Sequence, residues 1–171
     1  KVISPPPVKK SIEYQVSSIK DEIKILQPET VSELVTSGYL IPDTFDFFIV
    51  AAYAKILPQR ILGIPRLGVI GVHPSLLPKH RGASPIQSAI LNGDEETGVT
   101  LYLLDDKMDH GPILAQRELE FPISNLQFPI LQQKLAELSA DLLVETLPKF
   151  IKGGITPLPQ NESEATYTKK F

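Results

Sequence analysis

Short apolar runs alternate along the chain with longer stretches in which apolar residues recur every three or four positions. The short runs are rich in β-branched and aromatic residues and are bounded by turn-forming residues, which is typical of strands. We therefore expect strands at 23–26, 45–51, 69–73, 99–104 and 113–119.

Helix signals lie between these runs. Thr30 stands three residues before Glu33, the spacing of a capping box at a helix N-terminus. Pro85 suits the first turn of a helix over 85–91, and Asn92-Gly93 would end it, because glycine tolerates the left-handed closing conformation.

The longest helical pattern runs over 129–151, and we expect Pro148 to kink it or to end its first segment. Its apolar stripe is a core face rather than a cofactor site. The stripe consists of Leu131, Leu135, Leu138, Leu142 and Leu143. The remaining segment, 155–171, contains two prolines and is expected to run extended over the sheet.

Alternation of strands and helices predicts an α/β fold with a mostly parallel sheet covered by helices. The 171 residues, with 42% hydrophobic and 22% charged residues, suffice for one globular domain with its own core. No run approaches the roughly 20 apolar residues that span a bilayer, and the charged, Pro-rich start is not typical of a signal peptide. We expect a cytoplasmic protein that does not enter membranes.

Charge and cysteine content exclude several kinds of site. The chain has no cysteine, so disulfides, thiolate metal sites and a cysteine nucleophile are excluded. A net charge of −3 argues against binding nucleic acid mainly by bulk phosphate neutralisation. Any RNA contact must therefore be local.

The strongest candidate for chemistry is His73, at the carboxyl end of the expected strand 69–73, where ligand sites of α/β sheets lie. A Pro-bounded loop follows it, and a carboxylate, Asp109, comes later in the chain. Asp109 would orient His73 and favour its imidazolium form. Alone, a histidine at a strand end is more often structural.

The segments 68–78, 81–86, 97–100 and 107–114 resemble the family of formyltransferases that use 10-formyltetrahydrofolate, and 81–86 most resembles the branch that acts on methionyl-tRNA. The resemblance implies a Rossmann-like formyltransferase fold. It also implies that residues 1–171 are a partial catalytic domain, without the family's first βαβ unit and its C-terminal β-barrel. On this interpretation 155–171 begins a linker toward the barrel.

The resemblance assigns the catalytic roles to His73, Asp109 and position 71. Gly71 stands where the family pattern has asparagine, whose amide would point at the formyl oxygen. Loss of one oxyanion donor typically costs about 10² to 10³ in turnover. Three interpretations stay open: an impaired enzyme, a variant that uses a water or a neighbouring group instead, and a folate-binding module that has lost the reaction.

Three segments match those that line the family's folate pocket, so the resemblance implies 10-formyltetrahydrofolate as co-substrate. Main-chain groups of such segments suit the donor and acceptor edge of a pterin, and Ile56 and Leu57 could cover its apolar face. The expected contacts are Ala54, Lys55, Ile56, Leu57, Ser75, Leu76, Leu77, Pro78, Leu104, Asp105 and Asp106.

The implied acceptor is the α-amino group of initiator methionyl-tRNA, and the implied state is a monomer. An amino-sugar nucleotide and glycinamide ribonucleotide stay open as acceptors. The basic clusters Lys9-Lys10 and Lys79-His80-Arg81 would contact the tRNA acceptor end, although solvated charge is the simpler interpretation.

The remaining histidines are candidates for metal binding only by residue type. Together with His73 and Asp109, His80 and His110 could supply zinc ligands, but their spacing follows no recognised metal pattern, and we expect no metal. We expect His110 to be a loop residue and His80 to face solvent or substrate.

Overall fold

The computed structural model describes residues 26, 29–36, 38, 40, 45–53, 55–120 and 127–170. By its internal contacts the chain divides into two compact units, Lys1–Leu40 and Ile41–Phe171. The expected strand at 23–26 and the cluster Lys9-Lys10 lie outside the described residues, apart from Leu26.

In the first unit, helix α2 covers Val31–Thr36. The hydroxyl of Thr30 accepts a hydrogen bond from the Glu33 amide at 3.0 Å, as the capping signal predicted. The Glu33 carboxylate reaches past Thr30 and accepts from the Glu29 amide at 2.8 Å. The start of this helix is therefore set by local sequence.

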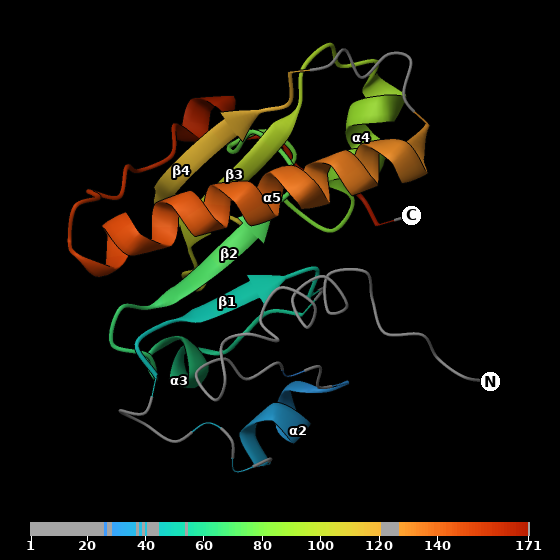
Figure 1. The fold of residues 1–171 in the computed structure, drawn as a ribbon. Helices are drawn as coiled ribbons and strands as arrows, with labels where there is room; N and C mark the ends of the chain where they lie inside the picture. Colours follow the sequence, from blue (N-terminus) through green and yellow to red (C-terminus); the bar gives the residue numbers. More distant parts are fainter. Residues whose placement is uncertain are drawn as a thin grey trace. The chain divides into compact units, whose positions relative to one another are not determined.

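The second unit is built on a four-stranded sheet in the order β1-β2-β3-β4 (Figure 1). All four strands lie where the apolar runs predicted them, with bounds that shift by a few residues at most. The strands are β1 Phe48–Ala51, β2 Val69–His73, β3 Gly98–Leu103 and β4 Ile113–Glu118.

The predicted α/β sheet with covering helices is confirmed, but the described strands form a mixed sheet. β1 and β2 are parallel, whereas β2–β3 and β3–β4 are antiparallel. A parallel neighbour needs a crossover of about a dozen residues or more, and the connection 104–112 between β3 and β4 is shorter. The segment 74–97 contains a helix, yet it returns to the end of β2 that it left, where His73 pairs with Thr100.

Two helices of this unit follow their predicted signals. α4 covers Pro85–Asn92 and ends at Gly93, whose φ of 68° is the left-handed conformation that favours glycine. α5 covers Phe128–Ile151 and continues through Pro148, so the helix does not end there, and a kink at Pro148 stays a prediction. A four-residue helix, α3 at Gln59–Leu62, was not predicted, because it is too short for a periodic pattern.

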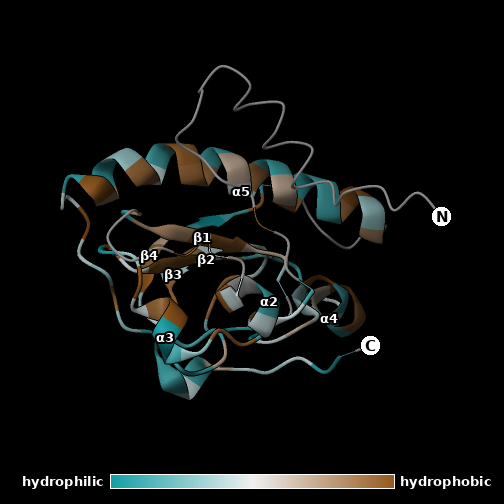
Figure 2. Ribbon diagram, turned by 90° about the horizontal axis from the view of Figure 1, so that it is seen from below, coloured by the Kyte–Doolittle hydropathy of each residue, from teal (hydrophilic) through white to brown (hydrophobic). Residues whose placement is uncertain are grey.

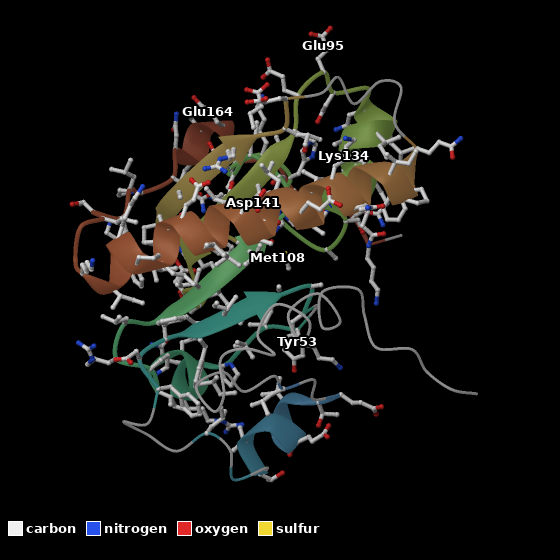
Figure 3. All side chains as sticks on the ribbon, in the orientation of Figure 1. Tyr53, Glu95, Met108, Lys134, Asp141 and Glu164 are labelled. Atoms are coloured by element: carbon white, nitrogen blue, oxygen red, sulfur yellow. The ribbon has the colours of Figure 1, made fainter. Side chains whose placement is uncertain are left out.

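α5 runs along one face of the sheet and supplies the core (Figure 2). Its stripe residues Leu131 and Leu135 are buried, as predicted, and pack in one cluster with Ile70 of β2 and Leu101 of β3. On the opposite side of the helix Asp141 is exposed (Figure 3). The cluster therefore occupies the α5 face and leaves the other face of β2 and β3 for chemistry.

A Leu135→Ala protein is expected to lose about 3 kcal/mol of unfolding free energy, because a buried leucine leaves a cavity. Leu135 is 1% exposed. Chemical denaturation measures the loss, and Val144→Ala, at a site 67% exposed on the same helix, is the control with little expected change. Equal losses for the two variants would contradict this packing of α5.

The segment after α5 is partly extended, as predicted, and is tied to the sheet and to the loop after β2. Leu158 bridges Ile113 at the start of β4, and Tyr167 bridges Arg81. Between these bridges lies a short 3-10 helix, η2, at Glu162–Glu164. That this segment begins a linker toward a further domain stays a prediction.

Candidate active site

The candidate site lies on the face of β2 and β3 opposite the α5 core. Gly71 and His73 alternate with the core residue Ile70 along β2, so they share this face. On β3, Tyr102 is paired with Gly71 and Thr100 with His73. The sheet thus sets four neighbouring positions on one surface.

His73 is buried, with a relative exposure of 6%. Its Nε2 lies 2.8 Å from the carbonyl oxygen of His80. Because a carbonyl can only accept, Nε2 carries the proton and donates it to His80. In the neutral ring, Nδ1 is then an unprotonated acceptor, and it faces Asp109 at 3.7 Å from Oδ2.

Asp109 lies in the loop 104–112 and folds back toward β2. Its Oδ1 accepts a hydrogen bond from the Tyr102 hydroxyl at 2.5 Å, and its Oδ2 accepts one from the Gly82 amide at 2.6 Å. Its backbone is left-handed, with a φ of 49°, a conformation that aspartate adopts more readily than most residues. Both carboxylate oxygens are therefore fixed.

The pKa of His73 is lowered from its ordinary value. Burial is the dominant cause, since it penalises the charged ring, while Asp109 and the bond to the His80 carbonyl act in the opposite direction. Asp109 thus favours the imidazolium, as expected, but burial of the ring outweighs this effect in the resting site. A neutral His73 can accept a proton. Asp109 lies beside Nδ1, where the positive charge of the protonated ring would be stabilised.

Gly71 has no free space above it. A Cβ at this position would lie 2.6 Å from both Cζ of the Tyr102 ring and Cδ1 of Leu104, well inside contact distance. The asparagine of the family pattern would meet the tyrosine ring in this packing. The absence of a side chain at position 71 therefore leaves no empty space, because the Tyr102 ring fills it.

The segment 160–167 closes over the loop after β2 through Arg81. This guanidinium is fully buried and donates to Gln160 at 2.8 Å, to Glu162 at 2.6 Å and to the Tyr167 hydroxyl at 3.1 Å. The amide of Gln160 also donates to the carbonyls of Asp109 and Gly111, at 2.9 and 2.8 Å. The segment therefore holds the Asp109 loop in place.

These contacts correct two sequence expectations. Arg81 cannot reach a tRNA, because its charge is used inside the protein. His80 does not face solvent, since it is 9% exposed and its Nε2 lies 2.5 Å from Asp94. Lys79 stays exposed, and His110 is a loop residue, as expected, with Nδ1 donating to Asp105 at 2.5 Å.

The first expected folate segment follows β1. Ala54 lies outside the described residues, and Lys55 is exposed. Ile56 and Leu57 do not share one environment, because Ile56 is 67% exposed and Leu57 is buried. Of the pair expected to cover a pterin, Ile56 is the one available at the surface.

The second expected folate segment, 75–78, follows His73 in the chain and is held by hydrogen bonds within the protein. The Ser75 hydroxyl donates to the Lys79 carbonyl at 2.6 Å, and the Leu77 amide donates to Thr100 Oγ1 at 3.1 Å. The Ser75 hydroxyl and the Leu77 amide are therefore both engaged in hydrogen bonds within the protein. The half-buried members of the segment are Leu76 and Pro78.

The third expected segment begins the Asp109 loop. Leu104 is half-buried beside Gly71, Asp105 binds His110, and Asp106 is exposed. Leu104 and Asp109 thus border the same face as His73. The assignment of all three segments to folate binding stays a prediction.

Sequence reasoning missed two residues that hold this site. Tyr102 was counted only as a strand residue, although an alternating strand pattern places it on the face of His73 once the β2–β3 register is known. Gln160 lies in a segment without periodicity, and nothing in the sequence signals its long-range bonds to the Asp109 loop.

Comparison with known proteins agrees with this geometry. The family profile described as Formyl transferase matches residues 6–147. The chain belongs to the formyl transferase family. Its segments 68–78 and 107–114, with His73 and Asp109, lie within the matched region, which confirms the resemblance drawn from them.

Curated relatives make the relationship more specific. A methionyl-tRNA formyltransferase of Roseiflexus sp. (strain RS-1) is 49% identical over 147 residues, which are 86% of this chain and 45% of that protein. One of Enterococcus faecalis is 43% identical over 98% of this chain and 51% of that protein. The chain thus spans about half the length of these relatives.

Solved structures of the family share the fold. The formyltransferase PseJ from Anoxybacillus kamchatkensis, in complex with UDP-4,6-dideoxy-4-formamido-L-AltNAc and tetrahydrofolate, is 26% identical with a TM-score of 0.75, over 93% of this chain and 80% of that one. HypX from Aquifex aeolicus, at 21% identity and a TM-score of 0.81, covers 96% of this chain and 28% of its own, a likeness of fold alone.

Among the described residues, no group of three or more His, Asp or Glu side chains is arranged to hold a metal ion. None of the helices in that part of the chain has both the length and the hydropathy needed to cross a membrane.

Proposed function

We propose that this chain carries the catalytic site of an enzyme that transfers the formyl group of 10-formyltetrahydrofolate to the α-amino group of initiator methionyl-tRNA. The observation that carries the proposal is the pair formed by neutral His73 and fixed Asp109, 3.7 Å apart, in a chain up to 49% identical to methionyl-tRNA formyltransferases. The reaction needs no covalent enzyme intermediate and no metal.

His73 acts as the base. The amine of the acceptor attacks the formyl carbon, the carbonyl becomes an oxyanion, and the nitrogen loses a proton to Nδ1 of His73. The oxyanion then re-forms the carbonyl, the bond between the formyl carbon and the folate nitrogen breaks, and the folate nitrogen takes the proton that His73 received from the amine. The low pKa of the resting ring keeps Nδ1 free to start this cycle.

Asp109 stabilises the charge that appears on His73. The imidazolium forms in a buried place, where an isolated charge is costly, and the carboxylate beside it offsets that cost. Tyr102 and Gly82 hold the carboxylate so that it does not turn away. His73 and Asp109 therefore act as one unit in this mechanism.

The folate lies against the segments 54–57, 75–78 and 104–106. Support comes from the sequence match to the family's folate segments and from PseJ, whose structure holds tetrahydrofolate. The exposed Ile56 and the half-buried Leu104 supply apolar contact for a flat ring. The formyl-bearing form is the one that the proposed reaction requires.

The acceptor is assigned from the relatives, whose names specify methionyl-tRNA. Lys79 is the exposed cation of the loop after His73 and is the local contact we propose for the acceptor end. Such a protein works in the cytoplasm, where bacterial-type translation begins, and we propose that it does so as a monomer.

One observation favours a second acceptor. PseJ, which covers 93% of this chain at 26% identity, is described with an amino-sugar nucleotide product. An amino-sugar nucleotide presents the same kind of primary amine to the formyl donor. The higher identity of the methionyl-tRNA enzymes supports methionyl-tRNA as the acceptor that we propose.

The test is a comparison of acceptors with the natural protein and 10-formyltetrahydrofolate. We expect kcat/KM for initiator methionyl-tRNA to exceed that for a UDP-amino sugar or glycinamide ribonucleotide by about 10² or more. A His73→Asn protein supplies the background rate. Faster transfer to the sugar would move the assignment to that acceptor, and folate binding without transfer to any amine would support the non-catalytic alternative.

A further inference from the structure

Tyr102 and Gly71 form a matched pair across two strands. They are direct partners in the β2–β3 register, and the tyrosine ring occupies the space that any side chain at position 71 would need. Cross-strand partners point to the same face, so a change at one position must be absorbed by the other. A tyrosine in this conformation requires glycine opposite.

The ring brings its hydroxyl to Asp109. The O–H donates to Oδ1 at 2.5 Å, while Oδ2 is the oxygen that faces His73 and accepts from the Gly82 amide. Tyr102 is 5% exposed, so this bond is shielded from water. Tyr102 and the Gly82 amide together thus fix the orientation of the carboxylate toward the histidine.

The phenol stays a donor at all working pH values. Burial and the charge of Asp109 together raise the pKa of Tyr102 far above its ordinary value. Because the Tyr102 hydroxyl keeps its proton, it can continue to donate its hydrogen bond to Asp109. The ring edge also meets the His73 ring at nearly a right angle, with centroids 6.5 Å apart.

We propose that Tyr102 is a positioning residue of this site, which holds Asp109 toward His73, and that Gly71 is the residue that makes room for it. The inference rests on the proposed function for the meaning of the site. It also gives a packing reason for the glycine at 71, because the Tyr102 ring occupies the space in which the side chain of an asparagine would lie. Adding asparagine at 71 alone should then harm the site rather than repair it.

The first test removes only the hydroxyl. In the natural protein, Tyr102→Phe is expected to lower kcat for formyl transfer by about 10- to 100-fold, with KM for both substrates unchanged within about twofold. Val144→Ala, at an exposed position of α5 that takes no part in the site, is the control and keeps kcat within about twofold. A Tyr102→Phe protein with wild-type kcat would overturn the proposal.

The second readout does not depend on formyl transfer. A histidine NMR titration, assigned by the signals that vanish in His73→Asn, should show the His73 pKa lower in Tyr102→Phe by roughly half a unit, because a released carboxylate supports the charged ring less. If Tyr102→Phe lowers the melting temperature and kcat but leaves this titration unchanged, the residue is merely structural and the proposal fails. An inactive wild-type protein that shows the shift would instead refute the proposed function.

The third test addresses the pair. Gly71→Asn alone should lower the melting temperature, whereas Gly71→Asn combined with Tyr102→Ala should recover part of the loss, since removal of the ring frees the space. Losses that simply add would show that positions 71 and 102 do not share that space. That result would overturn the pairing.

Discussion

An Asp109→Asn protein is expected to transfer formyl about 10³ times more slowly than the wild type, as judged by kcat/KM with saturating 10-formyltetrahydrofolate as the donor. The substitution keeps the size of the side chain but removes the charge that stabilises protonated His73. It also puts an amide group where Tyr102 and Gly82 both donate, so one of these donors loses its acceptor. The loss of charge and the loss of a hydrogen bond both weaken the support that Asp109 gives to protonated His73 during proton transfer.

The control for this experiment is Asp141→Asn, the same change on the exposed side of α5. Its kcat/KM should match the wild type. Circular dichroism and the melting temperature establish that both variants fold. An Asp109→Asn protein that retains more than about a tenth of the wild-type rate would show that His73 needs no charged partner, against the mechanism derived from the geometry.

The second large effect concerns stability. An Arg81→Met protein is expected to unfold with about 3 kcal/mol less free energy, because a fully buried guanidinium and its charge-assisted bonds to Glu162 are lost together. Urea denaturation measures the difference. Arg117→Met removes a bidentate pair with Glu145 at the surface and should cost much less, because exposed ion pairs are screened by solvent.

This difference should depend on pH. The hydrogen bond from Arg81 lowers the pKa of Glu162 below its ordinary value of 4.5. A lowered folded-state pKa stabilises the protein fully above the ordinary value and ceases to do so as the pH falls through the folded value. The gap between wild type and Arg81→Met should therefore narrow below about pH 4.5. A gap that widens in acid would contradict the ion pair as its cause.

Local pattern was enough to predict most of the framework. The run 69–73 is β2 to the residue, because β-branched residues between turn signals leave little choice. The helix start at Pro85 and its end at Gly93 follow from backbone preferences of single residues. The pairing directions could not be predicted in this way, because they depend on how loops route the chain, as the antiparallel β2–β3 pair illustrates.

The candidate site likewise contains residues that the sequence could predict and residues that it could not. His73 and Asp109 could be found by motif, and the structure places them 3.7 Å apart. Arg81 was misjudged, because a basic cluster in a loop gives no sign that a distant segment will bury one of its members. The direction in which Asp109 acts on the His73 pKa could be predicted, but the net shift could not, since burial outweighs Asp109 and burial is a property of the folded chain.

Whether His73 and Asp109 act as one unit is measured by single-turnover formyl transfer to initiator methionyl-tRNA with four proteins: the wild type, His73→Asn, Asp109→Asn and the double variant. Residues that act as one unit give losses that do not add. If His73 and Asp109 act as one unit, the double variant should transfer formyl at about the same rate as the slower single variant. Losses that multiply in the double variant would show that His73 and Asp109 act independently, and would contradict the mechanism.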